Sequence, residues 1–265
     1  MRFTKMQGIG NDYIYLDCTG ESPEDLPALA ARLSRLHFGV GSDGLICIFP
    51  SDAADFKMRM FNADGSEGEM CGNGLRCVCK FVYDKGLTGK TALTVETLAG
   101  IKRCTLHVEG DKVSTVTVDM GAPAVGEPFL LTVPDGTYLV TPVSVGNPHI
   151  VTFVDDVDGL DLPTLGPGFE HHPRFAPNRV NTEFVEVAVP GQLKMRVWER
   201  GSGETLACGT GACAALAAAA VSGRCGREAV VSLRGGELNI RWDEGDGHIY
   251  MTGPAVTVFE GEMNE

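Results

Sequence analysis

The chain lacks any long apolar run, and its first residues, MRFTKMQGIGNDY, hold no hydrophobic stretch of the kind that opens a secretory signal. The sequence therefore predicts a cytoplasmic protein without a membrane span. Basic residues are also scarce, since 22 Lys and Arg stand against 35 Asp and Glu, for a net charge of −13. A nucleic-acid partner requires a basic surface for its phosphates, so this class of function is not expected.

Cysteine is plentiful, with nine residues, but no CxxC pair occurs, and the closest spacing is the CxC of Cys77 and Cys79. Structural zinc sites are typically built from CxxC pairs, so a metal site is poorly supported. An odd number of cysteines in a reducing compartment also argues against a disulfide framework. Most of the nine are expected to be small buried hydrophobic residues, and the question is which of them are reactive.

The sequence contains an internal repeat. Residues 57–67 read KMRMFNADGSE and residues 194–204 read KMRVWERGSGE, at an offset of 137 residues. The elements CGNG at 71–74 and CGTG at 208–211 share that offset, and GNDYI pairs with GNPHI at an offset of 136. Several matches in the same order indicate a tandem duplication, in which Cys71 and Cys208 occupy equivalent positions.

The repeat predicts two domains, residues 1–115 and 116–254, with a last strand at about 255–265 that can return to the first domain. Helices are expected directly after Cys71 and Cys208, each closed by a glycine cap, and at residues 27–37. The expected fold class is α/β (α+β): two pseudo-symmetric duplicated domains, each a mostly antiparallel, barrel-like sheet around a central helix, with the active site in the cleft between the domains. Stretches rich in Val, Ile, Thr and Phe predict strands at residues 13–17, 45–49, 57–61, 93–97, 102–108, 113–119, 138–145, 150–154, 183–189, 193–199, 229–233 and 238–242.

Each CGxG element lies where a glycine-rich turn enters a predicted helix. The unpaired N–H groups of the first turn and the helix dipole form a site for an anion such as a carboxylate. The same field is expected to lower the pKa of a cysteine at the helix start. One such element is weak evidence for catalysis, but two at equivalent positions predict a pair of reactive thiols, Cys71 and Cys208.

A pair of opposed thiols suits the inversion of a stereocentre without a cofactor. One group removes the α-proton from one face of an amino acid and the other delivers a proton to the opposite face, whereas a single base tends to return the proton to the side it left. Two helix N-termini can stabilise the enediolate that forms between these steps. The residues alone therefore predict an amino-acid racemase or epimerase.

Five segments, in order along the whole chain, resemble the diaminopimelate epimerase family: KMQGIGNDYIYLD, FNADGSEGEMCGNGLRC, SVGNPHIV, RVNTEFV and WERGSGETLACGTGACA. The resemblance implies interconversion of LL- and meso-2,6-diaminopimelate, in lysine and peptidoglycan biosynthesis, with neither pyridoxal phosphate nor a metal as cofactor. It also implies a small-molecule substrate, no nucleic-acid or membrane partner, and a homodimer, since family members commonly dimerise.

The resemblance also implies roles for individual residues, with Cys71 and Cys208 as the catalytic pair. Donors to the carboxylate at the reacting centre are expected from Gly72, Asn73, Gly209 and Thr210. The other end of the substrate would be held by Asn11, Asn62, Asn147, Asn181 and Arg200. Glu199 and His149 would lie beside the cysteines, Glu199 as a substrate-binding group and His149 as an auxiliary group.

One departure and two alternatives remain open. Many family members have Asp-Gln where this chain has Asp43-Gly44, so one peripheral polar contact is missing. A proline or hydroxyproline racemase shares the paired cysteines, but typically has histidine after the first Cys-Gly, where this chain has Asn73, and lacks the arginine of ERGSGE. A thiol-redox small-molecule-binding protein, with a disulfide between the two cysteines, would show no proton exchange.

The replacement Arg200→Ala is expected mainly to weaken substrate binding, because a guanidinium can hold a carboxylate through two hydrogen bonds. Loss of a hydrogen bond to a charged group costs roughly 1.5–3 kcal/mol, so KM for diaminopimelate should rise about tenfold or more, with a much smaller change in kcat. Steady-state kinetics measure both constants. An unchanged KM would remove Arg200 from the substrate site.

Overall fold

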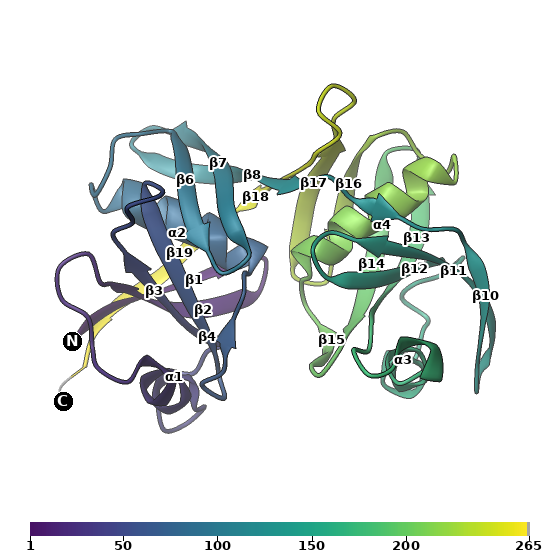
Figure 1. Cartoon of the computed structure of the whole chain (residues 1–265), viewed down its shortest axis with the longest axis horizontal. Helices are drawn as coiled ribbons and strands as arrows, with labels where there is room; N and C mark the ends of the chain where they lie inside the picture. Colours follow the sequence, from purple (N-terminus) through teal and green to yellow (C-terminus); the bar gives the residue numbers. More distant parts are fainter. Residues whose placement is uncertain (264–265) are drawn as a thin grey trace. The chain divides into compact units, whose positions relative to one another are not determined.

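The computed structural model describes residues 1–263 and divides into two compact units. Unit 1 comprises Met1–Asp119 and the segment from Thr252 onward, and unit 2 comprises Met120–Met251. The chain crosses between the units within two strands, β8 (Lys112–Gly121) and β18 (Ile249–Pro254) (Figure 1). Residues 264 and 265, which belong to the last predicted strand, lie outside the described residues.

Unit 1 is a sheet in which β19, β1, β2, β3, β4, β6, β7 and β8 follow one another as paired neighbours. The pairs β2–β3 and β4–β6 are parallel, and the other pairs in this series are antiparallel. The elements are β1 (Arg2–Gly8), β2 (Asn11–Asp17), α1 (Leu26–Ser34), β3 (Gly44–Phe49), β4 (Phe56–Asn62), β5 (Glu67–Gly68), α2 (Gly72–Asp84), β6 (Ala92–Thr97), β7 (Gly100–Glu109) and β19 (Val256–Glu262).

Unit 2 repeats this topology. Its strands β10, β11, β12, β13, β14, β16 and β17 pair in that order, and the parallel pairs β12–β13 and β14–β16 correspond to β2–β3 and β4–β6. The elements are β9 (Ala124–Val125), β10 (Phe129–Val133), β11 (Gly136–Ser144), β12 (Pro148–Phe153), α3 (Leu162–Glu170), a 3₁₀ turn (Pro173–Phe175), β13 (Asn181–Val189), β14 (Gln192–Glu199), β15 (Gly203–Thr205), α4 (Gly209–Val221), β16 (Glu228–Leu233) and β17 (Gly236–Trp242).

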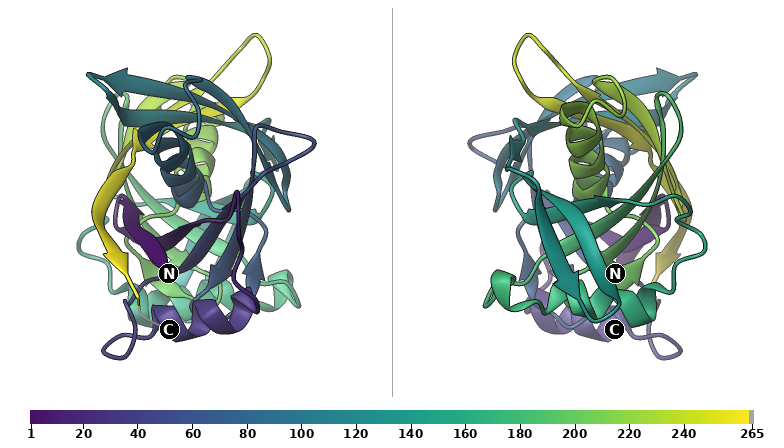
Figure 2. Two further views of the ribbon diagram at one scale, coloured as in Figure 1. Left: turned by 90° about the vertical axis from the view of Figure 1, so that its left-hand side faces the viewer. Right: turned by 90° about the vertical axis from the view of Figure 1, so that its right-hand side faces the viewer.

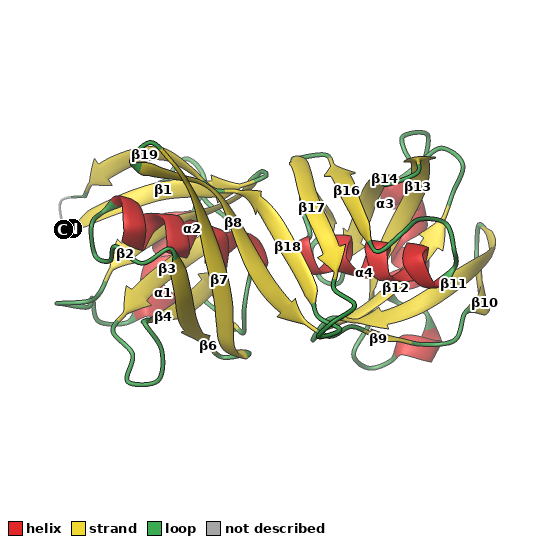
Figure 3. Ribbon diagram, turned by 90° about the horizontal axis from the view of Figure 1, so that it is seen from above, coloured by secondary structure: helices red, strands yellow, loops and turns green. Residues whose placement is uncertain are grey.

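A long helix lies within the curve of the strands in each unit, α2 in one and α4 in the other (Figures 2 and 3). The helix α4, with the sequence GTGACAALAAAAV, is buried along almost its whole length and contacts six strands of its unit. Alanine side chains let strands approach a helix closely from several sides, which explains why this helix has no polar face. The mostly antiparallel sheet around a central helix is confirmed, with two parallel pairs added in each unit.

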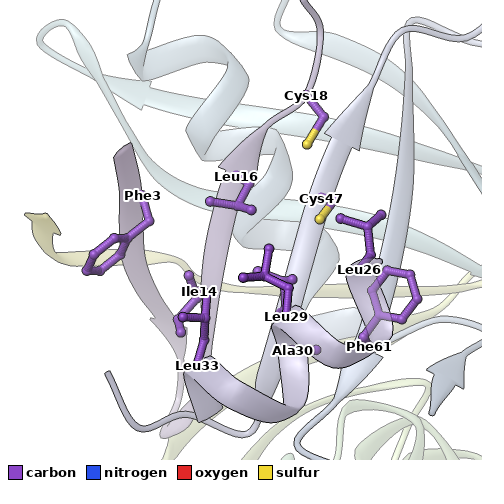
Figure 4. Close-up of a cluster of buried hydrophobic side chains, with 11 residues drawn as sticks. Phe3, Ile14, Leu16, Cys18, Leu26, Leu29, Ala30, Leu33, Cys47 and Phe61 are labelled. Carbon is purple, nitrogen blue, oxygen red and sulfur yellow. The ribbon is translucent and has the colours of Figure 1, made fainter. Parts of the chain in front are cut away.

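A shorter helix covers the other face of each sheet. In unit 1, α1 buries Leu29 and Leu33 against Ile14 and Leu16 of β2 (Figure 4). Between these two residues, Tyr15 points to the opposite face, where its hydroxyl lies 3.4 Å from the carbonyl oxygen of Gly74 in α2. Successive side chains of a strand alternate between faces, so a strand covered on both faces is apolar where it is covered, as residues 13–16 of β2 and the whole of β3 are.

The second short helix, α3, is absent from the sequence-based expectations. Its sequence, LPTLGPGFE, holds two prolines and two glycines, residues that normally mark turns. It forms because Phe169 packs edge-to-face on Phe184 at 5.2 Å between ring centroids, and Leu162 and Leu165 are buried in the same cluster. Tertiary burial here outweighs the low helix propensity of the segment.

The replacement Gly166→Ala is expected to destabilise the protein, although alanine is the better helix former by about 1 kcal/mol. A Cβ atom at Gly166 would lie 2.1 Å from Cδ2 of Trp198, whose ring is held by a 2.7 Å hydrogen bond from Nε1 to Glu170. Overpacking of this kind costs roughly 1–3 kcal/mol. The urea midpoint should fall, while Gly226→Ala, where a Cβ would meet no atom within 4 Å, should leave it unchanged. Equal midpoints for both variants would contradict the packing argument.

Candidate active site

Cys71 is the N-cap residue of α2, with extended backbone angles (φ −130°, ψ 117°), and its sulfur accepts a hydrogen bond from the Gly74 N–H at 3.4 Å. Gly72 and Asn73 form the first turn of the helix, as the sequence predicts. The thiol of Cys71 donates to Oδ1 of Asn11 at 3.1 Å, although 60 residues separate the two in the sequence. The structure therefore brings four of the predicted residues of unit 1 together at one helix N-terminus.

The amide of Asn11 is oriented by Asp43. Nδ2 of Asn11 donates to Oδ2 of Asp43 at 2.7 Å, and the backbone N–H of Asp12 donates to the same oxygen at 3.1 Å. Burial raises the pKa of Asp43, and these two hydrogen bonds oppose the rise. Because the amide nitrogen faces the carboxylate, the amide oxygen faces Cys71. Asn62 lies at the end of β4 and donates to Oγ of Ser66 at 3.0 Å.

Cys208 is the N-cap residue of α4 and has nearly the same backbone angles as Cys71 (φ −130°, ψ 105°). Its side chain is more deeply buried than that of Cys71. Its sulfur lies 3.6 Å from the hydroxyl oxygen of Thr210. The thiol also lowers the pKa of the Glu199 carboxyl group, which places the two groups near each other. Gly209 begins the helix, so the predicted CGTG arrangement is present in unit 2 as well.

A chain of polar side chains leads away from Cys208 within unit 2. Nδ2 of Asn147 donates to Oγ1 of Thr210 at 3.3 Å, and Oδ1 of Asn147 lies 2.9 Å from Nε2 of His149. Nδ1 of His149 lies 2.7 Å from Oε1 of Glu183, and both of these side chains are fully buried. His149, predicted beside the cysteines, thus reaches Cys208 through Asn147 and Thr210.

Two further predicted residues lie close together at the start of β13 and the end of β14. Oδ1 of Asn181 accepts the backbone N–H of Arg200 at 3.0 Å. The guanidinium of Arg200 donates from Nη1 to the carbonyl oxygen of Asn178 at 3.1 Å. Asn181 therefore fixes the backbone from which the arginine side chain extends.

The expectation that the helix field lowers the pKa of both cysteines is wrong for Cys208. Burial raises the pKa of the Cys208 thiol well above its ordinary value, and the carboxylates of Glu199 and Glu183 raise it further. The hydroxyl of Thr210 opposes this rise. The free energy needed to remove a thiolate from water is larger here than the stabilisation that the N–H groups of one helix turn provide. Burial also raises the pKa of Glu199, against hydrogen bonds from Thr205 and Cys208.

Asp43 and Glu183 contact the predicted residues Asn11 and His149 but are not themselves predicted. Glu183 occurs within RVNTEFV, one of the segments of the resemblance, and Asp43 occurs within GSDG, where the chain departs from the family. A charged residue in a strand normally faces solvent, so Glu183 carries no local signal of its burial. The one sequence feature that singles it out is the repeat offset of 137 residues, which aligns Glu183 with the apolar Ile46.

Among residues 1–263, no group of three or more His, Cys, Asp or Glu side chains is arranged so that it could hold a metal ion. Within the same residues, no helix is long and apolar enough to cross a membrane.

Solved structures of other proteins share the fold of this chain. A phenazine biosynthesis protein of the PhzF family from Bacillus anthracis matches with a TM-score of 0.77 at 19% sequence identity, covering 100% of this chain and 99% of that one. A hydroxyproline epimerase from Agrobacterium vitis matches with a TM-score of 0.70 at 17% identity, and the match covers 98% of this chain and 91% of that one. The expected α/β fold of duplicated units is thereby confirmed.

Comparisons of the amino-acid sequence identify the family of the chain. The family model for diaminopimelate epimerase matches residues 3–125 and 141–258. A diaminopimelate epimerase from Methanococcus maripaludis strain C6 is 54% identical to the chain, and the match covers 100% of both sequences. A diaminopimelate epimerase from Acetivibrio thermocellus is 55% identical, and the match covers 100% of this chain and 99% of that protein. The chain belongs to the diaminopimelate epimerase family, which confirms the resemblance identified in the sequence.

The replacement Glu199→Gln should make the thiol of Cys208 more reactive. It removes a carboxylate that raises the pKa of Cys208, so more thiolate is present at a given pH. The rate of alkylation by iodoacetamide at pH 8 should therefore rise roughly threefold to tenfold, because it follows the amount of thiolate present. Mass spectrometry of the Cys208 peptide measures the rate, and the Cys71 peptide of the same sample is the internal reference. A Cys208 rate equal to or below that of the wild type would contradict the assigned cause.

Proposed function

We propose that the chain is a diaminopimelate epimerase that interconverts the LL and meso isomers by two-base proton transfer between Cys71 and Cys208. The observation that carries the proposal is the occurrence of cysteine at the N-cap of the central helix in both units, with a glycine-containing first turn in each. Full-length identity of 54–55% to proteins named diaminopimelate epimerase supports the choice of substrate.

In the proposed reaction, one cysteine acts as a thiolate and takes the α-proton, so that an S–H bond forms as the C–H bond breaks. The electron pair passes into the α-carboxylate as an enediolate, which the N–H groups of the helix N-termini stabilise. The other cysteine, as a thiol, then gives its proton to the opposite face of the carbon. The cysteines exchange roles when the reaction runs in reverse, and no redox change occurs.

Glu199 is suited to receive the ammonium group at the reacting centre. Its partly buried carboxyl interacts with Cys208, and its negative charge is one cause of the raised pKa of that thiol. An ammonium group beside Glu199 would offset this charge and favour the thiolate of Cys208. Asn11, Asn62, Asn147, Asn181 and Arg200 are proposed to hold the other head of the substrate.

The alternative functions are less well supported. The hydroxyproline epimerase is similar only in fold, at 17% identity, and Asn73 follows Cys71-Gly72 where proline racemases typically have histidine. A thiol-redox binding protein would not need the hydrogen bonds that orient Asn11 beside Cys71 and Thr210 beside Cys208.

We further propose that the enzyme acts in the cytoplasm as a homodimer, in the synthesis of lysine and of peptidoglycan precursors. The support is the family membership, because relatives of this family commonly dimerise and the substrate is a precursor of both products. Sedimentation equilibrium of the purified chain, whose subunit mass is 28.2 kDa, would measure the assembly directly.

Incubation of the reduced protein with LL-diaminopimelate in deuterated water should yield the meso isomer with deuterium at the inverted α-carbon. The solvent deuteron enters because the donating thiol exchanges with water before it delivers its proton. Chiral chromatography and mass spectrometry measure stereochemistry and label together. Absence of deuterium from freshly reduced protein would exclude the epimerase.

The replacements Cys71→Ala and Cys208→Ala should each abolish epimerisation, because each removes the acid in one direction and the base in the other. General acid–base groups typically contribute about 10²–10⁴-fold, so turnover should fall by at least that factor. Cys225→Ala is the matched control, since this partly buried cysteine follows α4 and lies away from the helix start. Near-normal turnover in either of the first two variants would exclude the two-base mechanism.

A further inference from the structure

The duplicated units differ at one buried position next to the helix start. Glu183 in β13 and Ile46 in β3 are separated by the repeat offset of 137 residues, and each pairs with the equivalent residue of the next strand, Val197 and Met60. Each also lies against the third residue of the central helix. A Cβ at Gly74 would lie 2.6 Å from Cδ1 of Ile46, and a Cβ at Gly211 would lie 2.7 Å from Oε1 of Glu183.

Only unit 2 therefore places a carboxyl group at this point. The same imagined Cβ at Gly211 would lie 3.2 Å from the sulfur of Cys208, so Glu183 and Cys208 flank one glycine. The second difference is at His149, whose equivalent in unit 1, at the offset of 136 shared by GNDYI and GNPHI, is Tyr13. An apolar residue such as Ile46 suits the packing, so stability of the fold does not require a carboxyl group here.

We propose that Glu183 is a positioning residue for Cys208, because it acts through His149 and Asn147 to hold the hydroxyl of Thr210 toward the thiol. The inference rests on the proposed function of Cys208 as acid and base. It adds Glu183 to the residues that position Cys208, and it means that the hydrogen-bond donors and acceptors around Cys208 differ from those around Cys71.

The direction of each hydrogen bond follows from the partners. Nδ2 of Asn147 donates to Thr210, so Oδ1 of the same amide faces His149 and must accept from Nε2–H. Nδ1 of His149 faces Oε1 of Glu183. The imidazole of His149 and the carboxyl group of Glu183 must then share two protons. Both protons lie on the ring nitrogens, or one lies on Nε2 and the other on the carboxyl group. In both arrangements the pair is neutral overall and presents Nε2–H to Asn147.

The last step reaches the sulfur. The hydroxyl oxygen of Thr210 accepts from Asn147, so its own proton is available for Sγ of Cys208 at 3.6 Å. Without Glu183, Nδ1 of His149 would lose its partner in an environment that is fully buried, and the ring could carry its proton on either nitrogen. The amide of Asn147 would then be free to reverse, and the hydroxyl of Thr210 would turn to the amide oxygen instead of to the sulfur.

The test compares Glu183→Ile, which installs the residue of unit 1, with Glu183→Gln, whose amide can still donate to Nδ1. Glu183→Ile should lower kcat for diaminopimelate roughly tenfold, and Glu183→Gln should restore most of it. When Thr210→Val is already present, the further replacement Glu183→Ile should lower kcat by less than about threefold. Both replacements interrupt the same series of hydrogen bonds from Glu183 to Cys208. Glu186→Ile, on the same strand, should leave kcat unchanged. Thermal unfolding of each variant checks that the fold is retained.

A second measurement does not depend on activity. In protein labelled with ¹⁵N-histidine, the ring signals of His149 are identified by their loss in His149→Gln. They should show a protonated Nε2 in the wild type and in Glu183→Gln, and an average of two tautomers in Glu183→Ile. Unchanged His149 shifts in Glu183→Ile, or a kcat within twofold of the wild type, would overturn the proposal. A wild type that fails to incorporate deuterium would instead overturn the proposed function, while the ring signals would still test the positioning role.

Discussion

The structure depends on one steric constraint, the close packing of each central helix start against the middle of a buried strand. A side chain at the third helical residue would displace the side chain of the strand, because a Cβ at Gly74 or Gly211 would overlap with the end of Ile46 or Glu183. This approach places the N-cap cysteine, with its extended backbone, directly beside the first-turn N–H groups. The glycines thus bring the sulfur, the anion-binding N–H groups and the strand side chains to one point.

The same constraint explains how two copies of one unit could diverge in chemistry without a change of fold. The strand residue under the helix start must be of moderate length, and both isoleucine and glutamate satisfy that condition. In unit 1, the polar contact to the cysteine comes from Asn11, which Asp43 orients. In unit 2, it comes from Thr210, at the end of a path that begins at Glu183. Symmetry of the backbone therefore coexists with asymmetry of the proton donors and acceptors.

Much of this arrangement can be predicted from the sequence. The glycine caps after each central helix and the apolar strands are visible in short windows, and the repeat offset is visible when two distant segments are compared. Together they predict α2 and α4. The helix α3 is not predicted, because its prolines and glycines resemble a loop and its stability comes from contacts of Phe169 with a distant strand. The role of Glu183 is not visible in the sequence for the same kind of reason, since the burial of a single charged side chain depends on the elements that cover it. Asp43 is exposed, and its contact with Asn11 joins residues that lie 32 positions apart in the sequence.

The burial of Cys208 changes how its acidity has to be understood. A helix N-terminus alone would favour a permanent thiolate, but desolvation and two carboxylates keep this sulfur protonated near neutral pH. In unit 1, the thiol of Cys71 is placed to donate a hydrogen bond to the amide oxygen of Asn11. A two-base reaction nevertheless needs one thiolate, so its formation must be coupled to the arrival of the substrate. An ammonium group beside Glu199 meets this requirement, because it cancels one of the charges that oppose ionisation.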